Sequence, residues 1–181
     1  MKVALILANG FEEVEALAPL DILRRAGVSV ETVGIGAKTI VGAHNIPVIA
    51  DVSSLDADKD SYDAVIFPGG MPGSVNIDNS PFTDEIITSV MKKGGRLAAI
   101  CAAPLVLGRR GLLEGKRATC FPGFEGELKG AKIVKSGVVT DGNITTASGM
   151  LVALDFAKEL ASLLASSKIA EEIFTLKEIE L

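Results

Sequence analysis

The chain has 181 residues, a formal net charge of −5 and a hydrophobic content of 48%, so it is long enough to bury a core without disulfides or metals. Its lysines and arginines are scattered, which argues against a basic face for specific nucleic-acid binding, and no apolar run reaches the ~18 residues of a membrane span. One histidine excludes a multi-histidine metal site, and the two cysteines lack metal-motif spacing. We expect a single domain over residues 1–181, located in the cytoplasm and without a metal or cofactor.

The first three expected elements form one unit. Residues 2–8 are a continuous apolar run, typical of a strand buried on both faces. Residues 12–26 carry apolar side chains at helical spacing, and Pro19 predicts a kink or short break one turn before it. Residues 28–33 are a second strand. Because strand, helix and strand follow so closely, they predict a right-handed βαβ unit and a sheet that is parallel at its centre.

The later elements follow from apolar runs and helical spacing bounded by prolines and glycines. Asp141-Gly142 is a two-residue hairpin signal. In chain order we expect an edge hairpin or extended loop at 40–49, a polar connector at 52–60, a strand at 63–67, a turn at 68–73 and a helix at 81–93 with Ser80 as its N-cap. A strand at 97–100, a short helix at 104–108 and a turn at 112–116 follow. The remaining elements are strands at 117–121, 132–134, 138–140 and 144–147, a helix at 151–164, and a partly helical tail at 168–181 that docks on the fold.

The stretch around Cys101 is the candidate for chemistry. A short uncharged strand stops at Cys101, and two alanines and Pro104 then begin a helix. A cysteine on such a turn lies near a helix N-terminus, where free N–H groups and the macrodipole stabilise a thiolate. Cys101 is therefore a candidate nucleophile. The alternative is that it packs as a small hydrophobe, as free cysteines commonly do.

Ligands of open α/β sheets bind outside the carboxyl ends of the strands. Four turns of this chain qualify, and together they bring few polar groups. The candidates are the side chains of Glu12, Glu13, Glu15 and Ser148 and the N–H groups of Gly69, Gly70 and Ala102.

Glu15 differs from the two glutamates before it because it lies a turn deeper in the helix, where the helix dipole explains it less easily. A carboxyl partly desolvated beside a thiol has a raised pKa, and in its protonated form it donates a hydrogen bond to a thiolate. The turn at Gly69-Gly70 is either a tight connection or a source of backbone donors for a developing oxyanion. His44 suits a surface or interface, and a papain-like arrangement would need it to reach Cys101 from this or another subunit.

Three motifs, taken together, resemble the ThiJ/PfpI superfamily, closest to the branch of the Parkinsonism-associated protein deglycase and its bacterial homologues. The likeness runs from residue 2 to about 165. The motifs are Asn9-Gly10-Phe11-Glu12-Glu13-Val14-Glu15, Phe67-Pro68-Gly69-Gly70 and Ala98-Ala99-Ile100-Cys101-Ala102-Ala103-Pro104.

The resemblance implies an α/β fold, a flavodoxin-like three-layer sandwich with a mostly parallel central sheet and helices on both faces. It also implies a homodimer. By motif position, the resemblance implies that Cys101 is an oxidation-sensitive nucleophile on a strained turn, the elbow, and that Glu15 is its protonated partner. Gly70 and Ala102 would be the oxyanion donors, with Gly69 beside them. Arg24 and Arg25 would belong to an anion site or dimer edge, with His44 as a further candidate.

The activity implied by the resemblance is cofactor-free handling of glyoxals or early glycation adducts, with a small aldehyde or a glycated molecule as substrate. The alternative is a non-catalytic redox sensor or chaperone that uses oxidation of Cys101. Two departures from the family pattern matter. Phe121 stands where the human branch has a histidine near the elbow, which removes the obvious general base. Ala102 stands where the protease-like branch has a histidine, which disfavours a cysteine peptidase or amidase.

Overall fold

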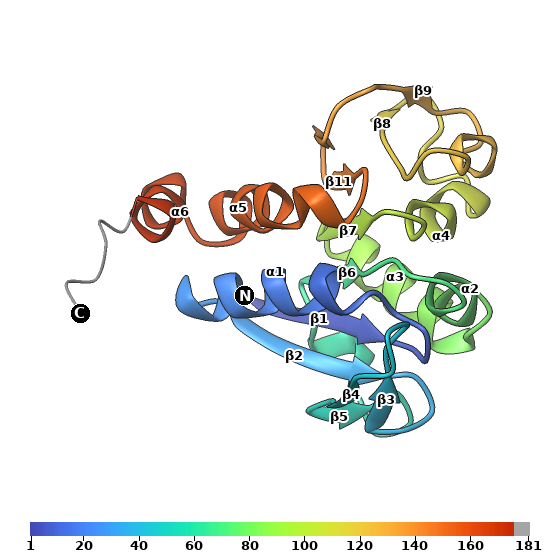
Figure 1. Ribbon diagram of the computed structural model, residues 1–181, viewed down its shortest axis with the longest axis vertical. Helices are drawn as coiled ribbons and strands as arrows, with labels where there is room; N and C mark the ends of the chain where they lie inside the picture. The colour runs from blue at the N-terminus through green and yellow to red at the C-terminus, as the bar shows by residue number, and fades with distance from the viewer. Residues whose placement is uncertain (176–181) are drawn as a thin grey trace.

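The computed structural model describes residues 1–175 and is built on a seven-stranded sheet, shown in Figure 1. All neighbouring strands are parallel except β10, which pairs antiparallel with β11 at one edge. The spatial order is β10 (Val138–Asp141), β11 (Ile144–Ala147), β7 (Arg96–Ile100), β6 (Ala64–Phe67), β1 (Lys2–Leu7), β2 (Ser29–Gly34) and β5 (Val52–Ser53).

The central strands are buried on both faces, as β1 shows. Val3, Leu5 and Leu7 pack into one hydrophobic core, and Ala4 and Ile6 pack into the other. All five side chains are almost completely inaccessible to solvent. Because successive side chains of a strand point to opposite faces, burial on both sides requires the unbroken apolar run seen in the sequence.

Helices cover both faces of the sheet, which confirms the flavodoxin-like three-layer prediction. The core that contains Val3 is closed by α1 (Glu13–Arg25), α5 (Ala153–Leu164) and α6 (Ser167–Phe174), and α1 packs along α5 (Figure 1). The opposite core is closed by α2 (Gly73–Asp78), α3 (Pro81–Lys92) and α4 (Pro104–Arg109).

The prediction of a short break in the first helix, near Ala16 or Leu17, is wrong. Helix α1 continues through Pro19 without interruption. A proline lacks only its own N–H, so the carbonyl that loses a helical partner is that of Glu15. Packing of the buried Ala16 and Leu23 against the sheet holds the helix on both sides of the proline.

The segment after the elbow differs most from the prediction. The strand expected at 117–121 is only β8 (Arg117–Ala118), which pairs with β9 (Lys132–Ile133) in a separate two-stranded sheet. The ladder stops because the N–H of Thr119 donates to Thr146 Oγ1 at 3.0 Å, and the N–H of Phe121 donates to the carbonyl of Cys101 at 2.8 Å.

The smaller elements agree in part with the sequence predictions. The hairpin expected at 40–49 is present as β3 (Thr39–Val41) and β4 (Pro47–Ile49). The polar connector at 52–60 contains the edge strand β5, and α2 follows the glycine-rich turn without having been predicted. The C-terminal tail is helical at α6, and residues 176–181 lie outside the described residues. Within residues 1–175, no helix is both long and apolar enough to span a membrane.

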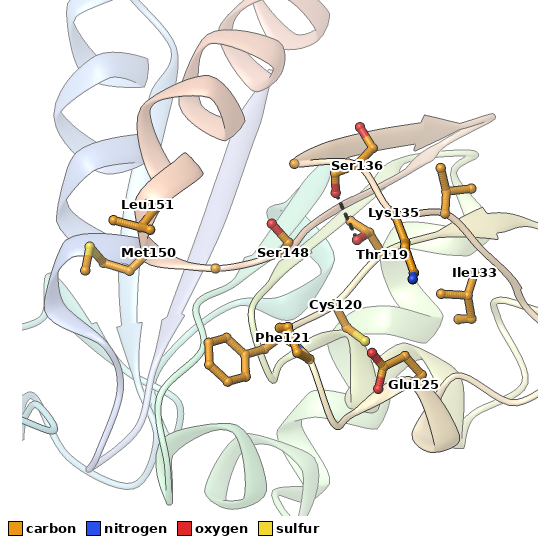
Figure 2. Close-up of a pocket in the computed structure, with 14 residues that line it drawn as sticks. Thr119, Cys120, Phe121, Glu125, Ile133, Lys135, Ser136, Ser148, Met150 and Leu151 are labelled. Atoms are coloured by element: carbon orange, nitrogen blue, oxygen red, sulfur yellow. Dashed lines mark hydrogen bonds between the residues drawn. The ribbon is translucent and has the colours of Figure 1, made fainter.

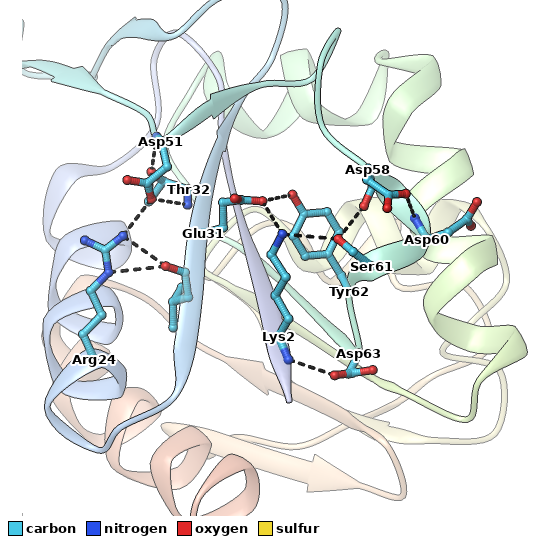
Figure 3. A network of polar contacts seen from close by, with 11 residues as sticks. Lys2, Arg24, Glu31, Thr32, Asp51, Asp58, Asp60, Ser61, Tyr62 and Asp63 are labelled. Atoms are coloured by element: carbon cyan, nitrogen blue, oxygen red, sulfur yellow. Dashed lines mark hydrogen bonds and ion pairs between the residues drawn. The ribbon is translucent and has the colours of Figure 1, made fainter.

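A paired polar network lies at the start of β1 and β6 (Figure 3). The N–H of Lys2 donates to Asp63 Oδ2 at 2.8 Å, and Lys2 Nζ lies 2.9 Å from a Glu31 carboxylate oxygen, to which the buried Tyr62 hydroxyl also donates. Burial alone would raise the pKa of Glu31, but the hydrogen bonds from Lys2 and Tyr62 outweigh it and hold that pKa below its ordinary value. One oxygen of this carboxylate, Oε2, is therefore paired with both Lys2 and Tyr62.

Candidate active site

Two glycine-rich turns are joined backbone to backbone at the carboxyl edge of the sheet. The N–H of Glu12, after β1, donates to the carbonyl of Gly69, after β6, at 2.9 Å, and the N–H of Gly73 donates to the carbonyl of Gly10 at 3.1 Å. Gly70 has φ = 88°, and a Cβ there would collide with the Glu12 nitrogen and lie 2.6 Å from the Gly10 oxygen. Glycine is thus required where these turns meet.

Glu15 lies in the first turn of α1, completely buried beneath this junction. Its Oε2 accepts a hydrogen bond from the N–H of Gly69 at 2.9 Å. Its Oε1 is also buried and has no hydrogen-bond partner within residues 1–175. A buried carboxylate oxygen without a donor is costly, which favours a proton on this atom.

Cys101 follows β7 in a strained left-handed conformation, with φ = 64°. Its N–H donates to the carbonyl of Ala147 and its own carbonyl accepts from the N–H of Phe121, both at 2.8 Å. These two bonds hold the elbow between β11 and the segment after β8. The side chain is half-buried, so the thiol is not sealed inside the core.

Gly69 shows how closely Glu15 and Cys101 approach each other. A Cβ on Gly69 would collide with Glu15 Oε2 and would lie 2.6 Å from Cys101 Cβ. The structure therefore brings the carboxyl and the thiol together on either side of one glycine.

The titrations of the two groups are coupled. Burial raises the pKa of Glu15 to about 7, although interactions with Cys101 and the Gly69 N–H lower it. Burial and then the ionised Glu15 carboxylate raise the pKa of the Cys101 thiol to about 12, against the N–H groups of Gly70 and Ala102, which lower it. The sequence suggests a depressed thiol pKa instead. The difference arises first because burial disfavours the thiolate and then because an ionised Glu15 repels it, so the thiol ionises more readily when Glu15 holds the shared proton.

His44 lies apart from the thiol, in the loop between β3 and β4. Its Nδ1 is 3.0 Å from Glu13 Oε2 and 3.7 Å from Glu12 Oε1, and its N–H donates to Glu13 Oε1 at 2.8 Å. In the part of the chain that the structure describes, these three residues are the group that could hold a metal ion. The hydrogen bond to Glu13 raises the pKa of His44, so a proton competes for the same place.

Arg24 and Arg25 lie at the opposite end of α1 from Glu15. Arg24 donates to Asp51 Oδ2 at 2.7 Å, and Arg25 donates to Asp21 Oδ2 at 2.7 Å. Both guanidinium groups are thus engaged within the chain and are not part of the Cys101 cluster. Their role in an anion site or dimer edge stays a prediction.

A cleft of about 890 Å³ begins beside the elbow (Figure 2). Gly149 separates it from the thiol, because a Cβ there would lie 3.2 Å from Phe121 Cδ2 and 4.0 Å from Cys101 Sγ. Sequence reasoning missed this cleft, since its lining comes from segments far apart in the chain. The lining residues are Thr119, Cys120, Phe121, Pro122, Glu125, Ile133, Val134, Lys135, Ser136, Gly137, Ser148, Gly149, Met150 and Leu151.

Comparison with known proteins gives consistent matches. Residues 1–163 match the model of the DJ-1/PfpI family. The chain is 34% identical to the protein dj-1beta of Drosophila melanogaster over 171 residues, or 93% of this chain and 91% of that protein. It is similar to the structure of a cysteine-to-alanine mutant of a DJ-1 superfamily protein from Salmonella typhimurium, with a TM-score of 0.88, 35% identity and 95% of each chain covered. Oxidized DJ-1 of Toxoplasma gondii matches with a TM-score of 0.90, 30% identity and 95% of each chain covered.

Proposed function

Since this chain belongs to the DJ-1/PfpI family, we propose that it is a cofactor-free, cysteine-dependent enzyme acting on glyoxals or early glycation adducts. The observation that supports this most is the buried Glu15 Oε1, which has no hydrogen-bond partner among the residues that the structure describes and lies close to a half-buried thiol on a strained elbow. A carboxyl so placed can take the thiol proton and return it.

The proposed reaction uses only groups of this site and water. The Cys101 sulfur forms a bond to the aldehyde carbon, the carbonyl π electrons move to oxygen, and the Gly70 and Ala102 N–H groups stabilise that oxygen. Because its pKa is about 7, part of Glu15 is ionised near neutral pH, and this form accepts the thiol proton and delivers it to the oxygen, which gives a hemithioacetal. The proton on the former aldehyde carbon then moves to the neighbouring carbonyl carbon, and the hydroxyl proton moves to the oxygen of that carbonyl, which gives a thioester of a 2-hydroxy acid. Water cleaves the thioester to the 2-hydroxy acid and the free thiol.

Glu15 carries the proton transfers in this scheme because Phe121 has no titratable group. The adjacent Cys120 offers no substitute, since burial and then the charge of Glu125 raise the pKa of its thiol to about 11. A mechanism that uses a histidine beside the elbow as general base is therefore not available at this position.

The direct test is methylglyoxal consumption and lactate formation by the wild type and by Cys101→Ser. We expect the variant to lose at least about 100-fold in kcat, because a hydroxyl at this position is far less acidic than a thiol. The unfolding temperature of the variant should stay close to that of the wild type. A folded Cys101→Ser protein that keeps its rate would refute the assignment.

The orphan Glu15 Oε1 also supports a second candidate, a redox sensor. Two peroxide molecules would convert the Cys101 thiol to a sulfinic acid and two waters, and a protonated Glu15 would donate a hydrogen bond to the product. Peroxide titration followed by mass spectrometry distinguishes the two functions. Stoichiometric oxidation of Cys101 without dicarbonyl turnover favours the sensor.

We further propose that the protein works as a homodimer in the cytoplasm, where its free cysteines stay reduced. Val14 and Leu17 of α1 are 46% and 36% exposed, and a second copy packed on this helix would cover them. Light scattering at micromolar concentration tests this, and a strictly monomeric mass would contradict it.

A further inference from the structure

The cleft beside the elbow is much larger than a small dicarbonyl needs. Its volume of about 890 Å³ lies within the range of roughly 300–1,000 Å³ found for pockets that bind drug-sized ligands. Methylglyoxal, with a single methyl substituent, would fill a small part of it. The cleft therefore has room for a substituent as large as an aromatic ring.

The side chains that line the cleft are largely apolar and partly exposed. Phe121, Ile133 and Met150 are 47%, 43% and 46% exposed, and Leu151 is almost entirely exposed. Figure 2 shows Phe121 and Met150 on the side of the cleft that faces the segment before α5, with Ile133 on the opposite side. Apolar surface of this kind gains free energy when an apolar ligand covers it.

Two polar side chains of the cleft have hydrogen-bond partners within the chain. Thr119 Oγ1 donates to the Ser136 carbonyl at 3.0 Å, and Glu125 Oε2 accepts from the Gly123 N–H at 2.7 Å. The raised pKa keeps the Cys120 thiol neutral. Lys135 is exposed, so its ammonium group can stay in water while an apolar ligand lies along its methylene stem.

The connection between thiol and cleft depends on Gly149. A Cβ at this position would lie 3.2 Å from Phe121 Cδ2 and 4.0 Å from Cys101 Sγ, so both the thiol and the ring lie next to Gly149. A substituent of a carbonyl carbon bonded to Sγ can therefore reach the Phe121 ring, which lines the cleft.

We infer that the cleft is a subsite for an apolar, aryl-sized substituent of the carbonyl substrate, with Phe121 as a specificity-determining residue. The substrate class is then aryl-substituted 1,2-dicarbonyls in preference to methylglyoxal. This inference rests on the proposed function for turnover, but recognition by the cleft requires only a reactive Cys101 thiol.

The first experiment measures recognition without turnover. The second-order rate constants for alkylation of Cys101 by iodoacetamide and by N-benzyl iodoacetamide are each divided by the value for free N-acetylcysteine. We expect the normalised rate for the benzyl reagent to be at least about tenfold higher in the wild type. Phe121→Ala and, independently, Ile133→Asp should bring the two rates close together. Leu55→Ala, which changes a side chain 80% exposed and outside the cleft, is the matched control and should keep the wild-type ratio.

The second experiment compares kcat/KM for phenylglyoxal and methylglyoxal, each corrected for its reaction with N-acetylcysteine. We expect the wild type to favour phenylglyoxal at least about tenfold and Phe121→Ala to lose most of that preference. Equal normalised alkylation rates in the wild type would overturn the inference even if both dicarbonyls are consumed. A benzyl preference without turnover of either dicarbonyl would retain the subsite and overturn the proposed function.

Discussion

Glu15 and Glu31 both lie against the central sheet, in opposite electrostatic settings. Glu31 is paired with Lys2 and Tyr62, and these partners hold its pKa below the ordinary value in spite of burial. Glu15 accepts a hydrogen bond from the Gly69 N–H and lies beside the Cys101 thiol, and burial raises its pKa to about 7. The two carboxyl groups differ in exposure as well as in partners, because 30% of the Glu31 side chain is exposed and it pairs with a lysine, whereas Glu15 is completely buried.

This difference suits Glu31 to a role in stability and Glu15 to a role in proton transfer. A carboxylate paired with a lysine and a tyrosine hydroxyl, as Glu31 is, stays ionised near neutral pH and joins β2 to the residues at the start of β1 and β6. A carboxyl that lacks a donor, next to a thiol, exchanges its proton in that range. The predictions below test whether the two glutamates really divide in this way.

The largest expected effect is on turnover. Glu15→Gln keeps the shape of the side chain and the bond from Gly69 but removes the exchangeable proton, so we expect kcat for methylglyoxal to fall by about 10²–10⁴-fold. The matched variant Glu31→Gln should stay within about twofold of the wild type, because Glu31 lies far from the thiol, in the network at the start of β1. Initial rates of lactate formation measure both.

Similar losses in both variants would mean that the carboxyl at position 15 has no special part in the reaction. A full rate in Glu15→Gln would place the proton transfer on another group, and the proposed scheme would have to be abandoned.

The next effect is on the pH dependence of stability. The pKa of Glu15 rises from 4.5 to about 7 in the folded state, so its contribution is fully present below pH 4.5 and is lost as the pH rises through 7. Between pH 4.5 and pH 8, the free energy of unfolding of Glu15→Gln should therefore improve relative to the wild type by about 3 kcal/mol. Urea unfolding at the two pH values measures this.

Glu31→Gln should show the opposite trend. Its pKa is lowered in the folded state, so the stabilisation by Glu31 is present above pH 4.5 and is lost as the pH falls through its folded pKa. The variant should be less stable than the wild type at pH 7 and should approach it in acid. Parallel pH profiles for the two variants would remove the distinction between the sites.

The central strands and the place of Glu15 and Cys101 at their carboxyl ends were predictable from the sequence. Apolar runs at 2–8, 63–67 and 97–100 correspond to β1, β6 and β7, because two-sided burial leaves a continuous apolar pattern. The carboxyl ends of parallel strands meet at one edge, so the proximity of Glu15 to Cys101 also followed from motif order.

The rest was not predictable for a physical reason. No periodic pattern of apolar residues in the sequence predicts the cleft. Residues 119–137 are held in place by long-range hydrogen bonds, such as the one from the Thr119 N–H to Thr146 Oγ1. The unpartnered Oε1 of Glu15 is likewise a property of three-dimensional packing. The same packing explains the raised thiol pKa, which helix-dipole reasoning alone did not suggest.

A smaller effect should come from the glycine between the carboxyl and the thiol. Gly69→Ala places a Cβ against Glu15 Oε2 and Cys101 Cβ, so we expect the free energy of unfolding to fall by about 2 kcal/mol. Gly126→Ala is the control, because nothing lies within 4 Å of a Cβ there and its φ is not in the left-handed region. If both variants unfold at the same urea concentration, the close approach of Glu15 and Cys101 is not real.

The smallest effect should come from the paired glutamate. Tyr62→Phe keeps the buried ring but removes the hydroxyl that donates to Glu31, while Lys2 remains as a partner. We expect a loss of about 1 kcal/mol in the free energy of unfolding at pH 7, since a second donor still satisfies the carboxylate. Combining Tyr62→Phe with Glu31→Gln in a double-mutant cycle isolates the pair from the packing of the ring. A coupling energy of zero would show that the hydroxyl contributes nothing to Glu31, and the low pKa of that carboxyl would then depend on Lys2 alone.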